Sequence, residues 1–309
     1  MYANTTGTRN IAIGKLAYDG SDTENDNIAI GFEAMTTDSA GGTANVAVGN
    51  YAGDAITSGD NNVVVGHQAG TAINAGGNNT ALGYNALAAH TTGSSVVAIG
   101  SSALAANTTA ANNIAVGQDS LVANTTGANN IAIGKDAMLA NTTGASNIAI
   151  GFEAMKTTNH GIDYNVAIGN YALYLNTTGA NNTAIGSLAL DANTTGAKNT
   201  AIGRDAGHQI TTGSNNICVG FEAGGSITDR ANNICIGNNS LNHGSNTNGH
   251  RNVMIGNLTD TNSTDSADQI VIGYNVTGTA DSNFTFGTGT SDSNIAFGAT
   301  SISAPSDIR

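Results

Sequence analysis

Short apolar triplets recur along the chain, each preceded by asparagine and closed by glycine. Residues 130–134, Asn-Ile-Ala-Ile-Gly, are typical. Two β-branched residues flank a small one, and this alternation with period two predicts a short β-strand. A second alanine stands three residues after the glycine, as at Ala137, and we expect a second short strand there. The rest of the unit is rich in Asn, Thr and Gly, which favour turns.

The closing glycine sets the period of the repeat. It recurs from Gly14 to Gly273 at intervals of 17 residues, lengthened to 18 or 19 at three places. A period this short cannot hold a helix pair or a propeller blade, but it fits one coil of a β-solenoid. We therefore predict an all-β protein, a parallel β-roll or β-solenoid with 17-residue coils, over residues 1–273. The intervals then fall to 14 and 11 residues, which predicts shortened or tapered coils over residues 274–302.

The triplets also predict which side chains face inward. We expect the two β-branched residues to point into a thin core and the central small residue to point outward. A smooth apolar face on a soluble protein is normally an interface, although alanine could simply be tolerated there. The residues proposed for this interface are Ala12, Ala29, Ala47, Ala115, Ala132, Ala149, Cys218 and Cys235. The two cysteines replace the alanine in adjacent coils, and stacked strands fit a disulfide poorly, so we interpret them as small apolar residues.

One correlated change favours a packed core. The residue after the second alanine is usually large, as at Leu104, but four coils carry glycine there and gain an isoleucine three residues later. These pairs are Gly53 with Ile56, Gly70 with Ile73, Gly207 with Ile210, and Gly224 with Ile227. Volume lost at one position is returned from its neighbour, as a close-packed interior requires.

Asparagine four residues before each closing glycine is a second recurrent feature. In stacked coils these side chains would form an amide ladder. Its predicted members include Asn10, Asn27, Asn45, Asn62, Asn79, Asn113, Asn130, Asn147 and Asn165.

Composition excludes several functional classes. The net charge of −13 disfavours attraction to nucleic acid or to an anionic membrane. No apolar run approaches the length of a membrane span. The six histidines fall at unrelated positions of their coils, and neither H-x-x-x-H nor C-x-x-C spacing occurs. We therefore expect no catalysis and no cofactor.

Carboxylates stack on consecutive coils. Asp119, Asp136 and Glu153 each lie two residues after their glycine, and like charges at strand spacing repel. Either neighbouring bases such as Lys135 and Lys156 neutralise them, or a structural cation bridges them. Neutralisation is the favoured interpretation.

The tandem Asn-Ile-Ala-Ile-Gly-x-x-Ala coils resemble the head repeats of trimeric autotransporter adhesins, which also occur in phage tail fibres. The resemblance covers about residues 8–273. In that family each chain forms a left-handed parallel β-roll, and three rolls pack around a threefold axis. The resemblance implies a homotrimeric surface structure that binds host cells or matrix, with the predicted alanine face as the trimer interface. Nothing in the sequence resembles the stalk or membrane anchor of the bacterial proteins.

The end of the chain carries a second resemblance. Residues 303–309 end in Ser306-Asp307-Ile308-Arg309, similar to the Ser-Asp-x-Arg entry of the intramolecular chaperone domain of endosialidase-type phage fibres. We interpret this segment as a remnant of that entry, which favours a phage fibre over a bacterial adhesin head.

The leading hypothesis is a structural and adhesive fibre segment, located outside the cell on a virion or, alternatively, on a bacterial surface. Its partners would be two further copies of the chain and a host surface glycan or protein receptor. Departures from a repeat map to surface loops, and His160, Tyr164 and His250 lie in such departures. These three residues are the receptor-contact candidates.

A different class of function is a monomeric solenoid that binds ice through stacked threonines. Thr108, Thr125 and Thr142 would form such a column on consecutive coils. The predicted location of these threonines in turns, rather than on a flat strand face, counts against it.

Overall fold

The protein is a parallel β-solenoid of about 15 coils with one short strand per coil and a 17-residue spacing. The computed structural model describes residues 4–20, 23–37, 41–158, 161–242, 249–263, 265–289 and 292–297. These residues contain no helix, and therefore none that could cross a membrane. The chain divides into two compact units, Met1–Asp163 and Tyr164–Arg309. The predicted chaperone-entry segment, residues 303–309, lies outside the described residues.

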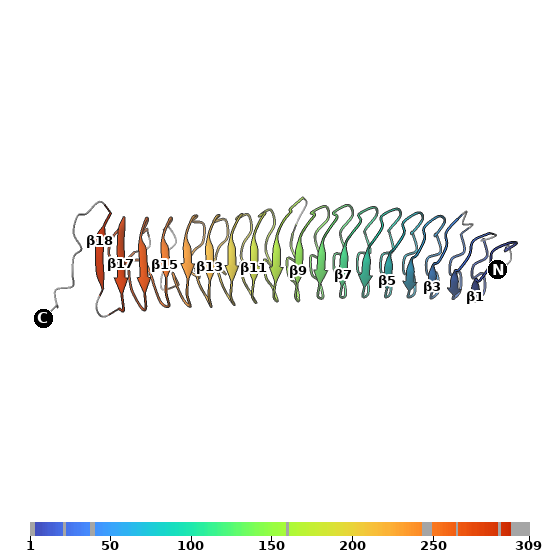
Figure 1. Cartoon of the computed structure of the whole chain (residues 1–309), viewed down its shortest axis with the longest axis horizontal. Helices are drawn as coiled ribbons and strands as arrows, with labels where there is room; N and C mark the ends of the chain where they lie inside the picture. The colour runs from blue at the N-terminus through green and yellow to red at the C-terminus, as the bar shows by residue number, and fades with distance from the viewer. Residues whose placement is uncertain are drawn as a thin grey trace. The chain divides into compact units, whose positions relative to one another are not determined.

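The described residues of the first unit form nine parallel strands that pair in chain order (Figure 1). They are β1 (Ile11–Ile13), β2 (Ile28–Ile30), β3 (Val46–Val48), β4 (Val63–Val65), β5 (Thr80–Leu82), β6 (Val97–Ile99), β7 (Ile114–Val116), β8 (Ile131–Ile133) and β9 (Ile148–Ile150). Every residue pairs with its repeat equivalent, as Ala115 does with Ala132. Equivalent residues therefore form straight columns along the unit.

The second unit continues the same pattern and ends differently. Its strands are β10 (Val166–Ile168), β11 (Thr183–Ile185), β12 (Thr200–Ile202), β13 (Ile217–Val219), β14 (Ile234–Ile236), β15 (Val253–Ile255), β16 (Ile270–Gly273), β17 (Asn283–Gly287) and β18 (Ser293–Ala296). β17 pairs in parallel with β16 after one shortened coil, with Gly287 opposite Gly273. β18 then runs antiparallel to β17, a reversal that the glycine spacing did not indicate.

The second strand predicted around Ala137 does not form. Asp136 and Met138, on either side of it, adopt left-handed conformations with φ of 57° and 52°. The segment is a turn that still bonds to the next coil, because the Met138 N–H donates to the Ala154 carbonyl at 3.0 Å. Each coil thus has one strand and a series of tight corners.

The predicted direction of the strand side chains is wrong. The central small residue points into the coil and the β-branched residues point outward. Among the proposed interface residues, Ala12 is partly exposed at the end of the first unit, and the others are buried: Ala29, Ala47, Ala115, Ala132, Ala149, Cys218 and Cys235. They therefore cannot form a face between subunits. The coil is so narrow that only a small side chain fits at the strand centre, because large residues such as Met138 and Leu104, themselves fully buried, already fill the interior.

The predicted volume compensation is confirmed. A Cβ added at Gly53 would lie 2.8 Å from Cδ1 of Ile56, and one added at Gly70 would lie 2.8 Å from Cδ1 of Ile73. Both isoleucines are at most 1% exposed. Isoleucine from the neighbouring position therefore occupies the space that leucine or methionine fills in other coils.

The predicted asparagine ladder also forms, and it is buried. Asn130 Oδ1 accepts the Asn147 backbone N–H at 3.0 Å. Asn130 Nδ2 crosses the coil and donates to the Gly144 carbonyl at 2.8 Å. The ladder therefore satisfies backbone groups that the narrow interior would otherwise leave unpaired.

The closing glycine is required by the stacking of the coils. Gly134 has a φ of 135°, and a Cβ there would clash with the carbonyl oxygen of Gly151 in the next coil. The same geometry recurs at Gly117 and Gly203. The glycine that marks the repeat in the sequence therefore allows close approach of successive backbones.

Candidate functional site: the outer sheet face and the first corner

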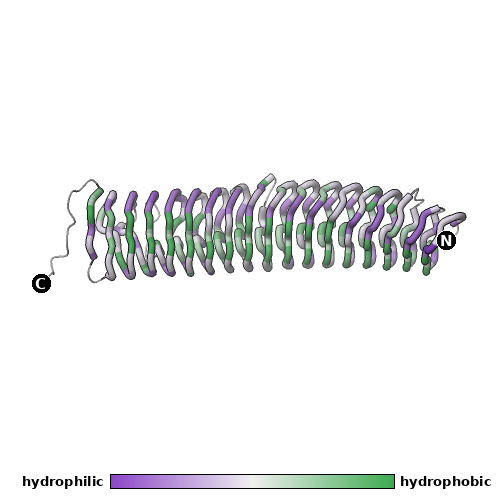
Figure 2. Tube along the Cα trace, in the orientation of Figure 1, coloured by the Kyte–Doolittle hydropathy of each residue, from purple (hydrophilic) through white to green (hydrophobic). Residues whose placement is uncertain are grey.

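The first and third residues of each strand form the outer sheet face of their unit. The third position of β1–β16 is always Ile, Val or Leu, and the first position is Ile, Val or, in three strands, Thr. Figure 2 shows hydrophobic colour recurring on the strand segments from coil to coil within each unit. Ile133 is 38% exposed and Ile202 is 39% exposed, so this face presents apolar surface to solvent.

No charged residue interrupts the outer sheet face, because none occurs at the first or third position of β1–β16. Threonine at Thr80, Thr183 and Thr200 shows that a polar β-branched residue is accepted at the first position. The wholly aliphatic third column is therefore not explained by β-propensity alone. Within each unit the exposed aliphatic residues therefore recur once per coil.

Two of the three stacked carboxylates, Asp136 and Glu153, lie beside basic residues. Lys156 Nζ lies 2.9 Å from a Glu153 oxygen and 3.7 Å from an Asp136 oxygen. Asp119 instead accepts a hydrogen bond from the Gln118 side chain at 3.0 Å. Neutralisation by a neighbouring base, the interpretation favoured by the sequence, fits these contacts. Within the described residues no group of three or more His, Cys, Asp or Glu side chains is arranged to hold a metal ion.

Of the three receptor-contact candidates, the structure describes Tyr164 and His250, which lie in different coils. His160 lies outside the described residues. Tyr164 is 64% exposed and precedes β10, whereas His250 precedes β15. His250 is half-buried beside Arg251 and Asp268, whose side chains pair at 2.6 Å. Hydrogen bonding from Arg251 is the main cause that lowers the pKa of Asp268.

Two members of the threonine column proposed for ice binding donate to backbone carbonyls, whereas the Thr142 hydroxyl is buried without a hydrogen-bond partner. Thr108 Oγ1 donates to the Thr125 carbonyl at 3.1 Å, and Thr125 Oγ1 donates to the Thr142 carbonyl at 3.0 Å. Both side chains are only partly exposed. Their hydroxyl protons therefore serve coil-to-coil bonding.

Cys218 and Cys235 are free thiols inside adjacent coils. They pair as neighbours in the sheet, and burial raises the pKa of Cys235 well above its ordinary value. A buried thiol that resists ionisation is unreactive, which agrees with their interpretation as small apolar residues.

The first corner after the closing glycine carries a row of rings in the first unit. We call Phe32, Tyr51, His67 and Tyr84 the aromatic strip. Their ring centroids are separated by 5.4, 6.0 and 5.8 Å in that order. Lys15 Nζ lies 5.9 Å from the Phe32 centroid and extends the row by one coil. Sequence reasoning missed this row, although four of its five members directly follow their glycines.

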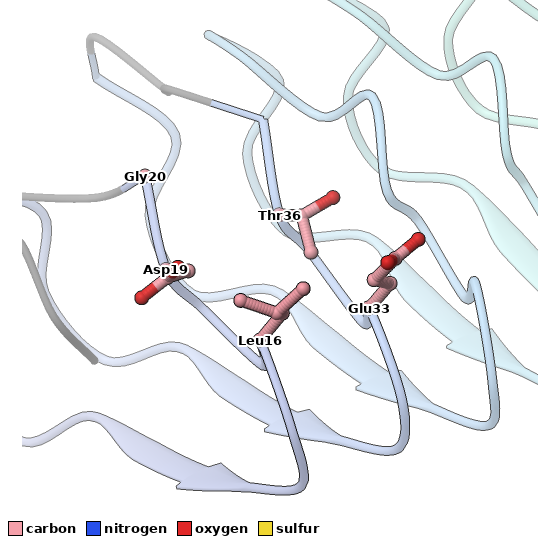
Figure 3. Close-up of a pocket in the computed structure, with 5 residues that line it drawn as sticks. All are labelled: Leu16, Asp19, Gly20, Glu33 and Thr36. Atoms are coloured by element: carbon pink, nitrogen blue, oxygen red, sulfur yellow. The ribbon is translucent and has the colours of Figure 1, made fainter.

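A hollow of about 360 Å³ lies beside the start of the aromatic strip. Figure 3 shows Leu16, Asp19 and Gly20 on one coil and Glu33 and Thr36 on the next, with the Glu33 carboxylate and the Thr36 hydroxyl pointing away from Asp19. Leu16 and Glu33 directly follow Lys15 and Phe32 in the sequence. The hollow therefore combines an apolar side chain with two carboxylates and one hydroxyl.

No protein-family model matches the chain, and no curated protein matches it. The class defined by the fold is a parallel β-solenoid with a buried small-residue column and an exposed aliphatic sheet face.

Proposed function

We propose that the chain is a structural and adhesive fibre segment in which three copies pack through their outer sheet faces. Phage tail fibre is the favoured setting, outside the host cell, and the head of a bacterial surface adhesin is the alternative. The left-handed sense of the coils, the threefold assembly and the host-attachment role come from the sequence resemblance. The predictions of no catalysis, no cofactor, no nucleic-acid partner and no membrane insertion are part of this proposal.

The observation that carries the proposal is the exposed aliphatic column of the outer sheet face. Fully burying an Ile or Val side chain is worth about 1.5–3 kcal/mol, so covering a side chain that is 38% exposed, such as Ile133, contributes roughly 1 kcal/mol. The column supplies one such residue per coil. The summed gain exceeds what a single ligand-sized contact could supply, which favours a partner that runs along the whole unit.

The repeat itself indicates what that partner is. Apolar residues recur on the face once per coil, at the separation of paired parallel strands. A partner must present matching apolar groups at the same separation to pack without voids. Another copy of the chain has apolar residues at the same separation because it has the same coils. Closed homo-oligomers are the common outcome of such self-association.

Sedimentation equilibrium of the full chain tests the proposal. We expect a mass three times that of the 30.7 kDa chain. A variant with Ile133→Arg and Ile150→Arg, which are neighbours on the face, should dissociate. The matched control, Thr126→Arg with Thr143→Arg, places the same charges on exposed turns of the same coils and should remain trimeric. A monomeric native chain, or a control that dissociates as the face variant does, would contradict the proposal.

A further inference from the structure

We propose that the aromatic strip and its adjoining hollow bind a neutral saccharide chain lying along the first unit. The inference rests on the proposed host-attachment function, and it names the chemical class of the ligand and the place where it binds. The observations that carry it are the ring geometry, the exposure of the rings and the polar groups beside them.

The rings form a continuous row of ring-to-ring contacts in which both edges and faces are presented. Phe32 and Tyr51 meet edge to face with an interplanar angle of 85°, Tyr51 and His67 with 84°, whereas His67 and Tyr84 are within 14° of parallel. Each ring occupies its own coil, so the row repeats once per coil. This repeat is close to the length of one pyranose residue in an extended chain, and the C–H faces of pyranose rings pack well against aromatic rings.

The fold does not need these rings. The same position after the closing glycine holds Ser101, Gln118 and Ser187 in other coils, and their strands pair in the same register. Tyr84 remains 56% exposed, so its ring contributes little buried area within the chain. His67 is also exposed, and Phe32 and Tyr51 are partly exposed. Aromatic rings that keep exposed surface where small polar residues would suffice indicate a surface for a ligand.

The hollow supplies the polar contacts that a saccharide requires. Asp19 and Glu33 carry carboxylate oxygens that accept hydrogen bonds from sugar hydroxyls, and the Thr36 hydroxyl can donate or accept. Leu16, which is 42% exposed, adds an apolar contact in the same hollow. Its volume of about 360 Å³ is within the range of small-molecule sites.

The local charge favours a neutral ligand over an acidic one. Asp54 lies near Glu33, whose negative charge adds to the larger effect of burial in raising the pKa of Asp54. Asp19, Glu33 and Asp54 together would repel sulfate, sialic acid or uronate groups. Lys15 lies at the same end of the row as the hollow, and its ammonium group is placed over the Phe32 ring. An uncharged oligosaccharide satisfies the carboxylates without that repulsion.

A glycan microarray probed with the full chain tests the inference. The probes are neutral hexose and N-acetylhexosamine oligosaccharides, with their sialylated and sulfated counterparts. We expect binding to neutral oligosaccharides, at least tenfold weaker binding by a Tyr51→Ala, Tyr84→Ala variant, and weaker binding to the acidic counterparts. The control is Tyr274→Ala, because Tyr274 also follows its closing glycine and is also 56% exposed, and it should bind as the native chain does.

Each other outcome overturns the inference. These outcomes are no binding to any neutral oligosaccharide, equal binding by the strip variant and the native chain, and preference for the acidic counterparts. Sedimentation equilibrium on the same samples separates the two proposals. A trimer that binds no neutral glycan would contradict the proposed saccharide site but not the trimeric fibre. A monomer that binds through the aromatic strip would contradict the trimeric fibre but not the saccharide site.

Discussion

The inner and outer faces of the same strands differ in a way that hydrophobicity does not predict. In β8 the inward Ala132 is fully buried, whereas Ile131 and Ile133, on either side of it, retain exposed surface. The more apolar residues thus lie outside. In a coil this narrow, the space opposite Met138 decides which side chain fits, and the larger aliphatic residues are left to cover the outer sheet face.

The largest effect is expected where a charge is placed on one face or the other of β8. Ala132→Asp would bury an unpaired carboxylate and overpack the coil, costing more than about 4 kcal/mol. Ile133→Asp places the same group on the outer sheet face, where water can reach it in the single chain. We expect the first variant to unfold and the second to stay folded while losing assembly, as measured by circular dichroism and sedimentation. Equal loss of folding in both variants would contradict the assignment of Ala132 to the inner face and Ile133 to the outer sheet face.

A volume exchange inside the coil is expected to have the next largest effect. Leu104→Gly removes a fully buried side chain and should cost about 3 kcal/mol or more, as large-to-small core changes do. Adding Asn107→Ile copies the arrangement of Gly53 and Ile56 but also removes the hydrogen bonds between Asn107 and Ala110, so it should recover part of that loss. Denaturant unfolding at one protein concentration measures both variants. A double variant less stable than Leu104→Gly alone would show that the compensation does not transfer between coils.

The buried asparagine ladder predicts a smaller loss. Asn130→Ala leaves the buried Asn147 N–H without its acceptor, and an unpaired buried donor costs about 1–3 kcal/mol. Thr143→Ala, at an exposed turn position of the same coil, is the control and should change stability by less than about 0.5 kcal/mol. Hydrogen exchange should show faster exchange of the Asn147 amide in the first variant, and unchanged exchange there would contradict the role of the ladder.

The smallest effect concerns the interior histidine His90. Its Nε2 is 2.7 Å from the Gly93 carbonyl and its Nδ1 is 3.3 Å from the Asn107 amide. Burial is the main cause that lowers its pKa. The unfolded chain therefore binds a proton first, at a pKa of about 6.5, so the contribution of His90 to stability is complete above that pH and is lost as pH falls.

His90→Asn tests this dependence, because asparagine fills the equivalent position in coils such as that of Asn124. Thermal melting at pH 7.5 and pH 5 should show a smaller decrease in the variant than in the native chain. An identical decrease would mean that other groups account for the acid sensitivity.

The period of the repeat and the volume compensation in the core could be predicted because each follows from the spacing of one residue type along the sequence. Gly134 is fixed by close approach of the next backbone, and Ile56 by the volume that Gly53 lacks. The direction of the strand side chains could not be predicted, because alternation assigns two faces without saying which is inner. The width of the coil decides that, and it depends on left-handed residues such as Leu121 and Met138, whose side chains carry no turn signal. The aromatic strip was missed because three of its members occupy a position that is polar in most coils and Tyr51 lies one residue further on.

Labelling of single introduced cysteines with a maleimide tests the central claim most directly. Ile133→Cys lies on the outer sheet face and Thr143→Cys on an exposed turn, while the native Cys218 and Cys235 are buried and should stay silent. If copies cover the outer sheet face, the thiol introduced by Ile133→Cys reacts in the assembled protein at least tenfold more slowly than the thiol introduced by Thr143→Cys. The two rates should converge when the assembly is dissociated. Equal rates in the assembled protein would contradict packing through this face.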